Sequence, residues 1–104
     1  MNTANIFDNI FIDKKNEQVF DILKKDNIRI EKIVSNGQKS EKDFWYEQEE
    51  NEFIMVIDGD AIIEFEDKEC ELKKGDYLII EKMIKHRVKY TDTNGPTIWL
   101  AVFY

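Results

Sequence analysis

Four side chains in the middle and second half of the chain have the types and the spacing to perform chemistry together. His86 is the only histidine, and Glu52 directly precedes the apolar run 53–57. Tyr46 and Gln48 have the same parity as Glu52. Because alternate side chains of a strand point to opposite faces, an acid and an imidazole that each begin an inward-facing row can meet in the mouth of a barrel. Such a convergence suits metal ligation or acid–base catalysis.

The elements that must position these side chains are short β-strands separated by regular turn signals. Glycines and the single proline fall at Gly37, Asp58-Gly59-Asp60, Gly75 and Asn94-Gly95-Pro96. This punctuation between short apolar runs is typical of a β-sandwich or barrel. The pattern predicts strands over 28–35, 52–58, 60–66, 69–72, 77–81, 86–91 and 97–103.

The segment 16–25 is ambiguous. Its apolar residues follow helical spacing, and Asn16 is suited to an N-cap (Val19, Phe20, Ile22 and Leu23). We therefore predict a short N-terminal helix that ends near Asp26-Asn27. A strand is the alternative, because short apolar runs satisfy both periodicities.

The spacing of the turn glycines and polar residues resembles the two half-motifs of the cupin family. The first half runs Gly37, Tyr46-Glu47-Gln48, Glu52 and Gly59, and the second runs Gly75 and His86. Tyr46 and Gln48 occupy the positions of the family's two histidines. The run Trp45-Tyr46-Glu47-Gln48 and the ending Trp99-Leu100-Ala101-Val102 are similar to a subgroup of small bacterial cupins of unassigned activity.

The resemblance implies an all-β fold, a single-domain cupin jelly-roll β-barrel. Residues 37–104 would form the barrel, and residues 1–36 would form a strand or helix segment that packs on it, giving one domain in total. A chain of 104 residues is of the usual size for one domain. Trp99 is expected to serve core or interface packing.

The resemblance also implies that the protein binds a small polar ligand inside the barrel. In one form of this hypothesis, a divalent metal mediates the binding. Gln48, Glu52 and His86 would hold the metal, with Mn, Fe, Ni or Zn all open. An enzyme would be a metal-assisted dioxygenase, isomerase or decarboxylase, with Glu52 and His86 at the metal and Tyr46 as proton donor. The alternative is a degenerate, metal-free cupin that serves as a ligand-binding or dimeric interaction module.

Composition excludes several other classes. A formal net charge of −7 without a basic stripe argues against nucleic acid as a partner. No apolar run is long enough to span a membrane, no signal peptide is visible and Cys70 is the only cysteine, so we expect a cytoplasmic protein. The last strand, 98–104, is apolar on both faces, and we therefore expect a homodimer in which a partner covers the outer face.

Overall fold

The computed structural model describes all residues 1–104 and consists of β-strands joined by turns and loops. The strands are β1 (Gln18–Lys25), β2 (Ile28–Ser35), β3 (Glu52–Asp58), β4 (Asp60–Phe65), β5 (Glu69–Lys73), β6 (Tyr77–Ile80), β7 (His86–Thr91) and β8 (Thr97–Phe103). The all-β expectation is confirmed, and each strand expected from residue 28 onward forms within one residue of its expected ends. No helix could span a membrane.

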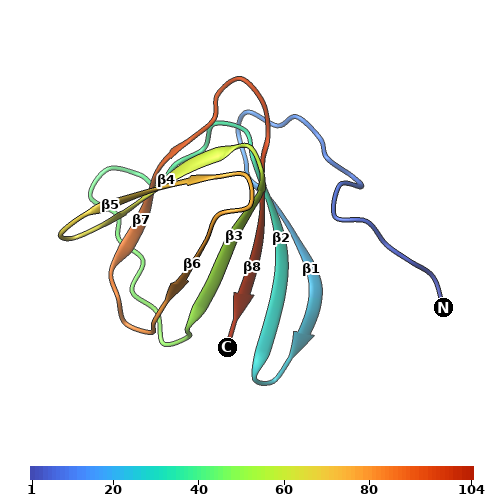
Figure 1. Cartoon of the computed structure of the whole chain (residues 1–104), viewed down its shortest axis with the longest axis horizontal. Coiled ribbons are helices and arrows are strands. Elements are labelled where there is room, and N and C mark those ends of the chain that lie inside the picture. Colours follow the sequence, from blue (N-terminus) through green and yellow to red (C-terminus); the bar gives the residue numbers. More distant parts are fainter.

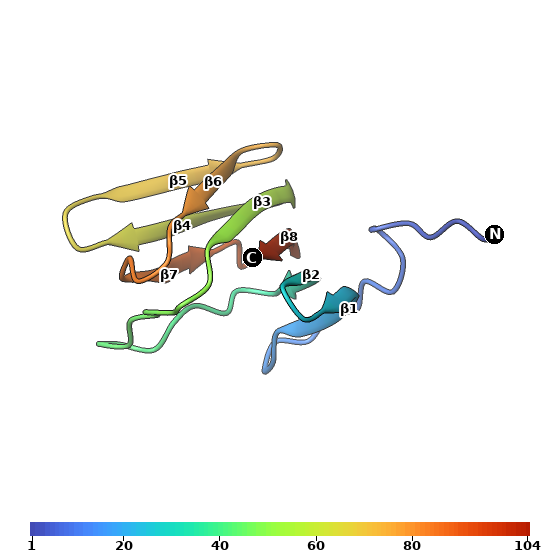
Figure 2. The same ribbon diagram turned by 90° about the horizontal axis from the view of Figure 1, so that it is seen from below.

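The strands form two antiparallel sheets that face each other as a jelly-roll barrel. One sheet has the order β1-β2-β8-β3-β6, and the other has the order β5-β4-β7 (Figures 1 and 2). The hydrophobic core lies between them and combines inward-facing residues of both sheets (Ile54, Val56, Ala61, Ile63, Leu72, Ile80, Trp99, Ala101 and Phe103). The first residues of the chain extend away from the sheets in both views (Figures 1 and 2), whereas the carbonyl oxygens of Asp8, Phe11 and Asp13 accept hydrogen bonds from β2 and the loop after it.

The predicted N-terminal helix is wrong, because residues 18–25 form the edge strand β1. β1 pairs with β2, and a β-bulge shifts the register between Asp21 and Leu23. Phe20 lies opposite Lys32 and Leu23 lies opposite Ile30, so these two apolar residues share one face although they are three positions apart. A bulge thus reproduces the spacing that otherwise indicates a helix. Tertiary pairing with β2 therefore decides that this segment is a strand and not a helix.

Gly59 and Gly75 both have positive φ, but only Gly59 lies tightly against other backbone. Gly59 joins β3 to β4 at φ +90°, and a Cβ built there would lie 2.7 Å from Thr97 Cα. Gly75 has φ +89°, yet a Cβ there would meet open space. Glycine at position 59 is therefore required both for its backbone conformation and for the close approach of the β8 start.

The outer face of the five-stranded sheet carries a continuous apolar row. Phe53 pairs with Ile79 on one side and with Val102 on the other, and none of the three shares a face with the cavity-lining Glu52 and Ile54. Ile79 and the neighbouring Tyr77 are both 60% exposed. Apolar side chains at the surface of a sheet are typical of an interface.

Candidate functional site

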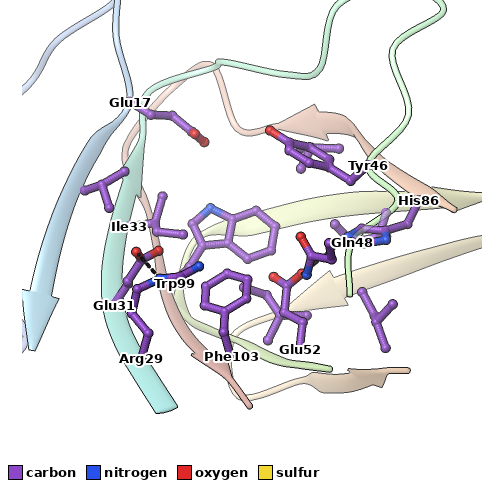
Figure 3. A pocket seen from close by; sticks show the side chains of 15 residues that line it. Glu17, Arg29, Glu31, Ile33, Tyr46, Gln48, Glu52, His86, Trp99 and Phe103 are labelled. Carbon is purple, nitrogen blue, oxygen red and sulfur yellow. Dashed lines mark hydrogen bonds and ion pairs between the residues drawn. The ribbon is translucent and has the colours of Figure 1, made fainter. Parts of the chain in front are cut away.

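A cavity of about 290 Å³ lies between the two sheets, and the side chains drawn in Figure 3 surround it. Its wall combines an apolar floor with charged and polar groups near the opening. The lining residues come from both sheets and from the loop before β3 (Glu17, Val19, Arg29, Glu31, Ile33, Tyr46, Gln48, Glu52, Ile54, Ile63, Ile80, His86, Val88, Trp99 and Phe103). All four residues singled out in the sequence, Tyr46, Gln48, Glu52 and His86, are among them.

Glu52 and His86 meet directly in this cavity. Glu52 begins β3 in the larger sheet and His86 begins β7 in the smaller sheet. Oε1 of Glu52 lies 3.3 Å from Nε2 of His86, and the two side chains are only 12% and 6% exposed. The parity argument therefore holds for both strands, since both groups point inward. Their chemical roles stay predictions.

Both ring nitrogens of His86 face hydrogen-bond acceptors. Nδ1 lies 2.9 Å from the carbonyl oxygen of Ile84, while Nε2 faces the Glu52 carboxylate. Burial lowers the pKa of His86, but the hydrogen bond to Glu52, the contact with the Ile84 carbonyl and the charge of Glu52 together raise this pKa above its ordinary value. The arrangement therefore stabilises the protonated ring relative to a free imidazole.

Gln48 completes the polar end of the cavity. Its Nε2 donates a hydrogen bond to Oε1 of Glu52 over 3.2 Å. Its backbone carbonyl accepts from the Met83 amide at 2.7 Å, which ties the loop before β3 to the loop before β7. Oε1 of Glu52 thus accepts from Gln48 and faces His86. The second carboxylate oxygen, Oε2, forms no hydrogen bond or ion pair with the protein.

Tyr46 lies against His86 through both backbone and ring. The two residues form an isolated β-bridge, with hydrogen bonds of 2.7 and 3.1 Å between their backbones. Their rings stack with centroids 5.7 Å apart. Burial raises the pKa of the Tyr46 hydroxyl, and the charges of Glu17 and Glu52 raise it further. The phenol therefore keeps its proton and can donate a hydrogen bond into the cavity.

The donor set does not fit a tightly held transition metal. Catalytic metal sites commonly use three protein ligands and one open position. Here one imidazole and one carboxylate converge, joined by an amide and a protonated phenol, and no group of three or more His, Cys, Asp or Glu side chains gathers anywhere in the chain. Nε2 of His86, the nitrogen that would bind a metal, is directed at the Glu52 carboxylate instead. Metal ligation by Gln48, Glu52 and His86 stays a prediction.

The charged lining residues Glu17, Arg29 and Glu31 and the indole of Trp99 were not identified as site residues from the sequence. Arg29 and Glu31 share the inward face of β2 with Ile33, and this shared parity was a usable signal. Glu17 was assigned to a helix start, and no pattern placed it at the cavity. Trp99 was assigned to packing; it is 2% exposed and also forms part of the wall.

Comparisons with known proteins place the chain among small β-barrels. Residues 32–103 match the Cupin domain family. A solved structure of a candidate mannose-6-phosphate isomerase from Ralstonia eutropha JMP134 is 35% identical, with a TM-score of 0.95, and the alignment covers 99% of this chain and 97% of that one. No curated protein matches significantly.

Two more distant structures support the fold alone. A cupin superfamily protein from Desulfitobacterium hafniense DCB-2 is 17% identical with a TM-score of 0.76, and covers 90% of this chain and 82% of its own. A conserved protein of unknown function from Streptococcus pyogenes is 12% identical with a TM-score of 0.79, and covers 98% and 85%. Similarity of fold does not by itself assign a function.

Proposed function

The chain belongs to the Cupin domain family, and we propose that it binds a small polar molecule in the barrel cavity, with Glu52 and His86 as the polar anchor. The observation that supports this most strongly is the buried acid–imidazole pair at one end of a preformed cavity of about 290 Å³. Burying two ionisable groups is costly unless they serve each other or a ligand. A mostly apolar cavity with a few convergent polar groups is the usual form of a small-molecule site.

The polar groups at this end offer a ligand several complementary contacts. Oε2 of Glu52 accepts a hydrogen bond from a hydroxyl or amine, and the Tyr46 hydroxyl donates one to a ligand oxygen. The side-chain carbonyl of Gln48 adds a second acceptor. These contacts use no metal ion, because Glu52 already orients His86 across 3.3 Å and Gln48 orients Glu52. The metal-free version is therefore the one that the donor set favours.

A second candidate is proton-transfer catalysis on the bound molecule. The relative from Ralstonia eutropha carries the description of an isomerase, and it is 35% identical over nearly the whole chain. Glu52 could act as base and His86 or Tyr46 as acid, since the groups converge on one end of the cavity. This second candidate function requires the same ligand site, but the bound molecule is then converted to a product.

A thermal-shift screen of a metabolite panel in the presence of a chelator tests the binding proposal. A ligand at one hundred times its Kd stabilises the folded state by about 2.7 kcal/mol. We expect hits that persist in the control Glu47→Gln, which changes an exposed neighbouring carboxylate, and that disappear in Glu52→Gln and in His86→Asn. Hits that survive both cavity variants would place the ligand elsewhere.

A further inference from the structure

The cations that line the cavity are already neutralised by protein carboxylates. Arg29 forms ion pairs of 2.9 Å with Glu31 and 3.2 Å with Glu50, and its guanidinium lies 4.2 Å from the centroid of the Phe103 ring. His86 faces Glu52. Arg29 is thus paired with two carboxylates and His86 with one.

Glu17 differs from the other lining acids, because no lysine, arginine or histidine pairs with it. Its only side-chain hydrogen bond comes from the Ser35 hydroxyl, which donates to Oε2 over 2.5 Å. Ser35 in turn accepts a hydrogen bond from Nε1 of the buried Trp99 at 3.0 Å. This chain fixes the carboxylate at the rim without neutralising its charge.

The Glu17 carboxylate faces the Tyr46 hydroxyl across the upper part of the cavity (Figure 3). Glu17, Glu31 and Glu52 are the three lining carboxylates, and Arg29 and His86 are the two lining groups that can carry positive charge. The cavity is therefore negative even when His86 is protonated, and the excess negative charge sits at Glu17. Glu17 is exposed at the rim, and a negative charge brought beside its carboxylate is repelled.

We propose that the cavity selects a ligand with a protonated amine, which binds Glu17 at the rim while the ligand's hydroxyl or carbonyl end reaches Glu52 and Gln48. This inference rests on the proposed function and names its ligand class. An ammonium group brings the donors that the Glu17 carboxylate lacks, and a charge-assisted hydrogen bond of this kind is stronger than a neutral one. The same charge distribution rejects a phosphate ester.

The walls between the two polar ends suit the body of such a ligand. Trp99 and Phe103 form aromatic surface, and Ile33 and Val19 add aliphatic surface beside the rim. Aromatic faces attract a nearby cation through their quadrupole, which adds to the attraction of the carboxylate. The volume is at the lower limit for small-molecule pockets, so the ligand is of simple metabolite size.

Three hexoses that share one ring and differ in charge test this selectivity. D-mannosamine is cationic at neutral pH, D-mannose is neutral and D-mannose 6-phosphate is anionic. We expect mannosamine to bind about tenfold tighter than mannose, as a hydrogen bond between charged groups allows, and mannose 6-phosphate to bind weakest. Glu17→Gln keeps the hydrogen bond to Ser35 and removes the charge, so it should bring mannosamine and mannose to within about threefold of each other. Glu47→Gln should leave the tenfold preference unchanged.

Three results would overturn the inference. These are tighter binding of the phosphate ester than of mannose, a preference for mannosamine that survives Glu17→Gln, and failure of all three hexoses to bind. The metabolite panel shows whether only the amine inference fails or the proposed function fails as well. If the panel yields anionic ligands whose binding depends on Glu52, the inference of an amine ligand is refuted but the cavity remains the binding site. If no ligand in the panel depends on Glu52, both the amine inference and the proposed function are refuted.

Discussion

Glu52 Oε1 and His86 Nε2 lie 3.3 Å apart although their strands belong to different sheets. The pair therefore connects the two layers of the barrel at the end where the cavity holds its polar groups. Gln48 and Tyr46 pack against the same two residues from the loop before β3. The geometry makes this cluster both a structural link between the sheets and a candidate ligand anchor, and the following predictions separate these properties.

The protonation of His86 should make stability depend on pH in a defined direction. Its pKa in the folded protein is raised above the ordinary value of about 6.5, so the folded state binds the proton more tightly than the unfolded chain does. The resulting stability is fully present below the unfolded pKa and is lost as pH rises through the folded pKa. We expect the difference in melting temperature between the wild type and His86→Gln to shrink as pH rises above about 6.5.

Because His86 is the only histidine, NMR titration of its ring protons reports this pKa directly. A midpoint below that of a histidine in a denatured control, or an unchanged pH profile in His86→Gln, would contradict the assignment of an imidazolium to the pair.

Metal affinity should be low and should respond to one substitution. Gln48 donates to Glu52 beside His86, so Gln48→His would add a second imidazole to the existing carboxylate and imidazole. Three strong ligands match the usual protein contribution to a zinc site. We expect substoichiometric metal in untagged wild-type protein by elemental analysis, and at least about tenfold tighter Zn²⁺ binding by calorimetry in the variant. Glu47→His, which places an imidazole on an exposed neighbour, is the control and should show no gain.

Substitution of Gly59 and of Gly75 should lower the free energy of unfolding by different amounts, although both positions have φ near +90°. Gly75→Ala places a Cβ in open space, so it should cost about 1–2 kcal/mol of unfolding free energy from the backbone conformation alone. Gly59→Ala also drives the Cβ to 2.7 Å from Thr97 Cα and should cost about 1–3 kcal/mol more. Urea denaturation measures both, and equal costs would show that the turn relaxes away from β8.

The apolar outer face of the five-stranded sheet should be the contact surface of a homodimer. Tyr77 and Ile79 are 60% exposed, and the Tyr77 ring stacks on Phe53 at 5.3 Å. Ile79→Lys would place a charge in this row and should convert a dimer to a monomer in analytical ultracentrifugation. Ile84→Lys changes an exposed isoleucine in the loop before β7 and should leave the association unchanged. A wild type that sediments as a monomer at high concentration would refute the prediction.

The positions of the strands and the inward direction of the four candidate residues could be predicted from the sequence. Both follow from local chemistry, because turn residues end the strands and alternation fixes the parity of Glu52 and His86. The short segment before Asp26 could not be predicted in the same way. Its bulge between Asp21 and Leu23 breaks the alternation, and only pairing with β2 shows that the backbone is extended.

The sequence by itself determined the all-β fold, the turns at Gly59 and Gly75, and the inward rows that begin at Glu52 and His86. The tertiary structure decided which rows face one another, and so brought Glu17 and Arg29 to the same cavity. The physical reason is that strand alternation is a property of neighbouring residues, whereas sheet order depends on hydrogen bonds between distant segments, such as β2 with β8. The charge of the cavity follows from the second property, because strand parity gives the inward direction of Arg29 and Glu31 but not which other charged residues they meet.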